Sequence, residues 1–82
     1  MGNEIEPIER ARRGLGLAIS DLWWRYFAIG GMLTELEVEA VLYQALIPTE
    51  IDRDMLAVAL NERFSELGGD HPLRYSDDVD TV

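Results

Sequence analysis

The chain contains no cysteine, so it can form neither a disulfide framework nor a metal site built on thiolates. A protein of 82 residues is one small domain, and such domains often depend on a disulfide, a bound metal, close helix packing or self-association. The sequence therefore favours packing and self-association as sources of stability. The lack of cysteine also suits a reducing compartment, and we expect a cytoplasmic protein.

Basic residues are scarce as well. Seven arginines and no lysine stand against 16 acidic residues, which gives a formal net charge of −9. Nucleic-acid binding depends on cations that neutralise phosphates, so this balance argues against direct contact with nucleic acid. The one basic cluster, Arg10, Arg12 and Arg13, lies beside glutamates on an expected helix, where local ion pairs are the more common outcome.

Long apolar runs are also absent. No run reaches the roughly 18 apolar residues needed to cross a bilayer, and the opening residues MGNEIEPIE lack the basic and apolar regions of a signal peptide. The negative charge further disfavours anionic membrane surfaces. We therefore expect no membrane association.

Helical periodicity is the main feature that the sequence does contain. Apolar residues recur at intervals of three and four over residues 7–29, and Gly30 and Gly31 then end the pattern. Gly14 and Gly16 each cost about 1 kcal/mol in a helix interior relative to alanine, so a break near them is allowed. The sequence predicts a first helix over 7–29, with an extra N-terminal helical turn if the chain breaks there.

Two further helices have clear starts. Thr34 and Glu37 have the spacing of a capping box, which predicts a second helix over residues 34–46 that ends before Pro48. A second threonine and acid with this spacing predict a third helix over residues 49–67. The expected fold is therefore all-α, a compact three-helix domain.

The remainder of the chain has no apolar period. We expect a single helical domain over residues 1–76, in which residues 70–76 lie extended against the helices through Leu73 and Tyr75. The last six residues, 77–82, are expected to form a flexible acidic tail.

Residues with catalytic or metal-binding chemistry follow no recognisable motif. Catalysis of acyl transfer needs a nucleophile beside a base, and nothing in the sequence organises the serines around the single histidine, His71. The C-terminal aspartates lack the glycine-punctuated loop of a calcium site. We predict that the chain is not an enzyme and has no catalytic residue, cofactor or metal.

The stretch SDLWWRYFAIGG, residues 20–31, places two tryptophans, a tyrosine and a phenylalanine on two turns of one helix. At about 100° per residue, Trp23 falls on the face that also carries Leu22 and Tyr26, whereas Trp24 falls almost opposite. Asp21 and Arg25, four residues apart, occupy the narrow polar strip. The pattern predicts that Trp23 belongs to the core and that Trp24 belongs to an interface.

The third helix repeats this arrangement with a second apolar stripe away from its main face. Each helix of a three-helix monomer contacts only two neighbours, so the surplus apolar surface requires another molecule or the C-terminal segment folded back over it. Tryptophan is enriched where binding energy concentrates. We therefore predict that the partner-binding residues are Leu17, Trp24, Phe27, Ala28, Ile51, Met55 and Val58.

Two functions fit these features. The first is a small acidic cytoplasmic protein–protein interaction module, a regulator or adaptor that binds a protein partner of basic charge, forms a homodimer, or both. The second is an acidic inhibitor that mimics nucleic acid and occupies the groove of a nucleic-acid-binding protein. The sequence favours the first, and the spacing of carboxylates that the second requires cannot be read from helical periodicity.

Overall fold

The computed structural model describes residues 5–68, and these residues form four helices and no strand. The prediction of an all-α fold is confirmed, but the helix count is four rather than three. The expected acidic tail, residues 77–82, and the expected extended segment, residues 70–76, lie outside the described residues. The four helices are α1 (Glu6–Leu15), α2 (Ile19–Ala28), α3 (Glu35–Leu42) and α4 (Glu50–Glu66).

The predicted first helix is divided because the chain turns at Gly16. Gly16 has φ 67°, a left-handed conformation that glycine adopts without steric cost. Its N–H donates to the carbonyl of Arg13, and the N–H of Leu17 donates to the carbonyl of Arg12. This pair of bonds is a Schellman motif, which ends a helix. The break that the glycines allowed is therefore complete, and residues 7–29 form two helices.

Helix α3 corresponds to the predicted second helix, and it starts where predicted but ends earlier. Thr34 and Glu37 form both bonds of the capping box, at 3.1 Å and 2.8 Å. The helix ends at Leu42 instead of residue 46, because Gln44 adopts φ 63° and the N–H of Ala45 turns back to the carbonyl of residue 40. The predicted stop at Pro48 is wrong, since a Schellman motif ends the helix several residues before the proline.

The longest helix, α4, begins after Thr49, whose hydroxyl accepts a hydrogen bond from the backbone N–H of Asp52 at 3.1 Å. It ends one residue before the predicted position. The apolar stripe Leu56, Leu60, Phe64 and Leu67 predicts its inner face; Leu56 and Leu60 are buried and Phe64 is half-buried, whereas Leu67 lies past the helix end and is exposed. The start of this helix is therefore predicted by its cap and its inner face by the apolar period.

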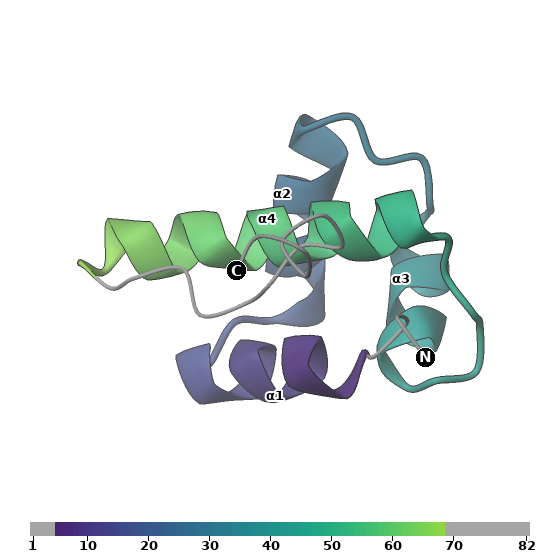
Figure 1. Cartoon of the computed structure of the whole chain (residues 1–82), viewed down its shortest axis with the longest axis horizontal. Coiled ribbons are helices and arrows are strands. Elements are labelled where there is room, and N and C mark those ends of the chain that lie inside the picture. The colour runs from purple at the N-terminus through teal and green to yellow at the C-terminus, as the bar shows by residue number, and fades with distance from the viewer. Residues whose placement is uncertain (1–4, 69–82) are drawn as a thin grey trace, which may run out of the picture.

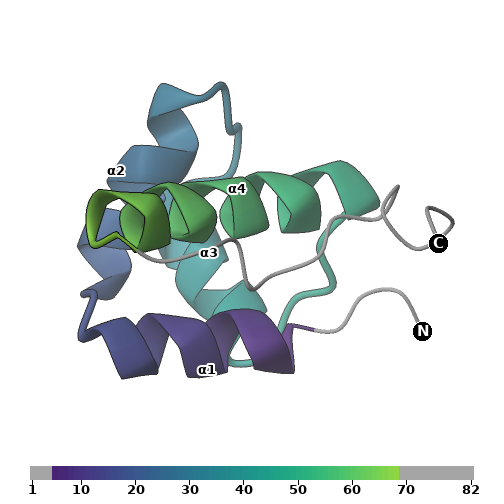
Figure 2. The same ribbon diagram turned by 60° about the vertical axis from the view of Figure 1, so that its left-hand side comes forward.

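The helices surround one hydrophobic core. Helix α4 packs on α2 and on α1, and α3 packs on the same two helices. In both views α4 crosses α2, and α1 runs below α4 along the lower edge of the molecule (Figures 1 and 2). The end of α2 and the loop that follows it extend past α4 (Figure 1). The fully buried core side chains are Ile8, Leu22, Tyr26, Val38, Val41, Leu56, Ala57, Ala59 and Leu60.

Candidate protein-binding surface

Tyr26 fixes the end of α2 from inside the core. Its ring is fully buried, and its hydroxyl oxygen accepts hydrogen bonds from the backbone N–H groups of Met32 and Leu33, both at 3.0 Å. The same hydroxyl donates to a carboxylate oxygen of Asp52 on α4 at 2.8 Å. Burial raises the pKa of Tyr26, so the hydroxyl keeps its proton at neutral pH. One side chain therefore joins α2, the following loop and α4.

The loop after α2 is shaped closely to this ring. Gly30 has φ 104°, and a Cβ atom at Gly31 would overlap the aromatic ring of Tyr26. Alanine at Gly31 would therefore have to displace a fully buried side chain. The two glycines act as a helix stop, as predicted, and they also allow the loop to lie against the core.

Trp23 lies at the boundary between the core and the surface. Its ring is half-buried and packs against the core, and its indole N–H donates to the carbonyl of Leu33 at 3.0 Å. The prediction that Trp23 belongs to the core is therefore correct only in part, because the ring packs against the core but is not fully buried. The hydrogen bond holds the indole in a single orientation and fastens it to the same loop that Tyr26 holds.

Trp24 and Phe27 lie on the outer side of α2, and both are at least half exposed, with accessible fractions of 61% and 50%. Their ring centroids are 5.8 Å apart, and Trp23 lies 5.8 Å from Trp24 and 5.3 Å from Phe27. These separations are typical of interacting aromatic pairs. Because Trp23 is fixed by its hydrogen bond, the two exposed rings rest on an ordered support.

Two further exposed hydrophobic side chains lie on, or three residues after, the loop backbone that Trp23 and Tyr26 hold. Met32, in the loop that Tyr26 and Trp23 hold, is 88% exposed, and Leu36, on the first turn of α3, is 72% exposed. The predicted site residues include neither Met32 nor Leu36. The sequence does carry a signal for Leu36, because it lies off the main apolar face of its helix and between two glutamates. We define the aromatic surface as Trp23, Trp24, Phe27, Met32 and Leu36.

The other predicted partner-binding residues have different surroundings. Leu17 and Met55 pack against the core and are only partly accessible, so they offer little area to a partner. Val58 is also half-buried, whereas Ala28 and Ile51 are exposed. The predicted set therefore lies on α2, on α4 and, for Leu17, in the connection between α1 and α2.

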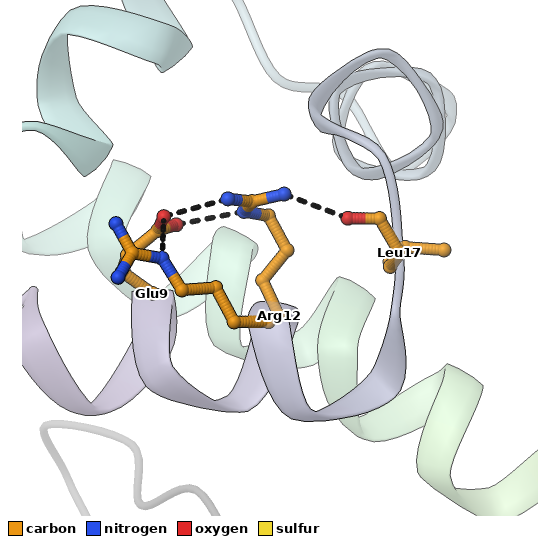
Figure 3. Close-up of polar contacts among 4 residues, drawn as sticks. Glu9, Arg12 and Leu17 are labelled. Atoms are coloured by element: carbon orange, nitrogen blue, oxygen red, sulfur yellow. Dashed lines mark hydrogen bonds and ion pairs between the residues drawn. The ribbon is translucent and has the colours of Figure 1, made fainter.

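The basic cluster of α1 is bound within its own helix. Arg12 donates two hydrogen bonds to the carboxylate of Glu9, at 2.7 Å and 2.6 Å, and a third to the carbonyl of Leu17 at 2.8 Å (Figure 3). Arg13 adds a bond to the same carboxylate at 2.9 Å, and Arg10 pairs with the carboxylate of residue 6 at 3.2 Å. The hydrogen bonds from Arg12 hold the pKa of Glu9 below its ordinary value. The predicted local ion pairs are confirmed.

An open hollow of about 400 Å³ lies between α1 and the end of α3. Its charged groups already pair with one another, Arg13 with Glu9 and Arg10 with Glu6, so an incoming ion would have to break these pairs. Residues 5–68 contain no group of three histidine or acidic side chains that could hold a metal. None of the helices in this part of the chain has both the length and the apolar character needed to cross a bilayer.

No protein-family model matches the chain, and no curated protein or solved structure matches it either. The geometry of the described residues is therefore the guide to function. In that geometry the aromatic surface combines exposed rings with a fixed support, which is a combination suited to binding.

Proposed function

We propose that the protein is a small protein–protein interaction module, a regulator or adaptor, and that its aromatic surface contacts the partner protein. The observation that carries this proposal is the state of Trp24 and Phe27. Both rings are at least half exposed, Phe27 stacks on the hydrogen-bonded ring of Trp23, and Trp24 stacks on Phe27 and lies tilted against Trp23. Tryptophan is among the residues that contribute most to binding energy at interfaces.

The rigidity of the surface supports the same proposal. Association costs free energy for every side chain and loop that must become ordered. Trp23 and Tyr26 fix the loop that carries Met32 through three hydrogen bonds to its backbone. The aromatic surface is thus ordered before a partner arrives, and this lowers the cost of binding. A cytoplasmic location is part of this proposal, as is binding without a cofactor or catalytic step.

Self-association is the other use of this surface that the proposal includes. Sedimentation at micromolar concentration would detect a dimer. If the wild type forms a dimer and Trp24→Ala does not, the aromatic surface is where the second copy binds. A monomer that remains monomeric at much higher concentration would leave a different protein as the partner.

The mimicry of nucleic acid is less well supported. That function requires carboxylates that are free to replace phosphates. Glu6, Glu9 and Glu66 instead form ion pairs with arginines of this chain. Other carboxylates, such as Glu35 and Glu39, form no salt bridge within residues 5–68, but mimicry gives no role to the exposed rings of Trp24 and Phe27, so we do not adopt this alternative.

Photo-crosslinking from the centre of the surface tests the proposal. Trp24 would be replaced with p-benzoylphenylalanine in the cell that makes the protein, with the same replacement at Tyr43 as the matched exposed aromatic control. We expect a covalent adduct with one protein from position 24, absent from position 43. Adducts of equal amount and pattern from both positions, or none from position 24, would contradict the proposal.

A further inference from the structure

The distribution of charge along the chain restricts the chemistry of the partner. Between Arg25 and Arg53 the sequence has no basic residue, but it has five acidic residues. The same stretch carries seven of the nine large exposed hydrophobic side chains found among residues 5–68. Exposed apolar side chains and an excess of acidic residues therefore occur in the same stretch of the sequence.

Three carboxylates lie within three residues of members of the aromatic surface along their helices. Asp21 lies three residues before Trp24 on α2, and Glu35 and Glu39 lie one residue before and three residues after Leu36 on α3. Residues three apart are neighbours on a helix surface. None of these carboxylates forms a salt bridge within the described part of the chain. We call Asp21, Glu35 and Glu39 the acidic rim.

The nearest cation is already bound elsewhere. Arg25, on α2, donates both of its terminal N–H groups to the carboxylate of Glu66 on α4, each at 2.9 Å. A fork-to-fork pair of this kind fixes the guanidinium in place. Arg25 also interacts electrostatically with Asp21 and partly offsets its charge, whereas Glu35 and Glu39 form no salt bridge within residues 5–68 and are available to cations of another molecule.

A second copy of the chain suits this surface poorly. In a two-fold dimer the same patch lies on both sides of the contact, so the acidic rim would face another acidic rim. Like charges brought together at an interface oppose association. The rim is better matched by lysine or arginine side chains, and a guanidinium can also lie over the face of Trp24.

The form of the partner follows from the elements that build the surface. The aromatic surface is made by two helices and the loop between them, and residues 5–68 offer no strand edge to which an extended peptide could add. An amphipathic helix docks on such surfaces through apolar residues at positions i, i+3, i+4 and i+7. Resting on the proposed function, we infer that the aromatic surface accepts a cationic amphipathic helix of the partner protein.

Synthetic peptides provide the test. Three helical peptides of about 18 residues, or five turns, would be titrated into the full chain by calorimetry. The first is an amphipathic leucine–arginine helix, the second has the same composition with its leucines distributed around the helix, and the third is an amphipathic leucine–glutamate helix. We expect the first to bind at least about tenfold more tightly than either of the others.

Variants locate the binding site. Trp24→Ala should weaken binding of the first peptide by about tenfold or more. The double variant Glu35→Gln/Glu39→Gln should weaken it less and should reduce its dependence on salt, because the rim acts through screened charge. Ile47→Ala is the matched control, since Ile47 is highly exposed but lies in the connection between α3 and α4. This control should bind like the wild type.

Each contrary result has a distinct meaning. Equal binding of the first two peptides, or no binding of the first, would overturn the inference, as would equal losses in Trp24→Ala and Ile47→Ala. If the glutamate peptide binds more tightly than the arginine peptide, and Trp24→Ala weakens that binding, the inference of a cationic partner is wrong. The aromatic surface would still be a docking surface. The proposed function fails separately, if crosslinking from position 24 captures no protein.

Discussion

The two sides of α2 use aromatic residues in opposite ways. On the inner side, Tyr26 is fully buried, and its hydroxyl forms three hydrogen bonds that link α2 to the next loop and to α4. On the outer side, Trp24 and Phe27 are stacked but at least half exposed. Trp23 lies at the boundary between the two sides, packed against the core and stacked with Phe27.

This difference indicates how a small domain can hold exposed aromatic rings in place. The inner side supplies the packing and the polar anchors, and the outer side is built on this support. Burial of the inner aromatic residues stabilises the fold through the hydrophobic effect, whereas the outer aromatic residues stay largely in solvent and contribute little to folding in this way. The unused apolar area is available for binding energy, and we therefore expect mutations on the two sides to affect different measurements.

The largest contrast is expected between the adjacent tryptophans. Trp23→Ala should reduce the free energy of unfolding by about 3 kcal/mol, because it removes a ring packed on the core and a hydrogen bond to the loop. Trp24→Ala should reduce it by less than about 1 kcal/mol, since most of that ring is in solvent. Urea unfolding monitored by circular dichroism would measure both.

If Trp23→Ala does not fold, Trp23→Phe keeps an aromatic ring at the boundary and allows the comparison to be made. Equal losses of stability at positions 23 and 24 would remove the distinction between the two sides of α2.

A smaller effect is expected when the polar anchor alone is removed. Tyr26→Phe keeps the buried ring but leaves the N–H groups of Met32 and Leu33 without their acceptor. We expect a loss of about 2 kcal/mol in the free energy of unfolding, the cost of unsatisfied buried groups. Faster hydrogen exchange at these two amides would identify the cause. Tyr43→Phe, on an exposed ring, is the control and should change neither measurement.

Acid should weaken the attachment of α2 to α4. Hydrogen bonds from Arg25, and then from Arg63, lower the pKa of Glu66 from 4.5 to about 2. Because this pKa is depressed in the folded state, the contribution of Glu66 is present above pH 4.5 and is lost as the pH falls toward 2. Thermal melts across this range should therefore show a shallower pH dependence for Arg25→Met than for the wild type.

Both side chains of this pair are partly exposed, so we expect a small effect at neutral pH. Glu66→Gln should reproduce the shallower profile, and Asp21→Asn, on the same helix, should not. A profile for Arg25→Met as steep as that of the wild type would exclude this pair as a cause of acid sensitivity.

The sequence predicts those parts of the fold that depend on neighbours along the chain. The capping box of Thr34 and Glu37, the start of α4 at Thr49, and the burial of Leu22 and Tyr26 on one face of α2 all follow from local spacing. The ion pairs of α1 also form between residues three or four apart. These interactions are local, and for this reason periodicity and capping rules detect them.

Features that depend on contacts between distant residues were not predicted. Arg25 lies four residues from Asp21 on α2, as the sequence indicates, but the partner of its hydrogen bonds is Glu66, 41 residues away. Tyr26 reaches Asp52 across the core, and Gln44 ends α3 in a left-handed conformation that glycine more often supplies. The exposure of Met32 likewise follows from how Tyr26 holds its loop, which no local pattern encodes.

The most direct test of the two-sided account is hydroxyl-radical labelling of the protein in the cell that makes it and in purified form. In the purified protein at low concentration, Trp24 and Met32 should label readily because both are exposed. If a partner covers the aromatic surface, labelling of Trp24 and Met32 in the cell should fall, while labelling of Tyr43 should stay unchanged. If Trp24, Met32 and Tyr43 are each labelled to the same extent in the cell as in the purified protein, the account is contradicted.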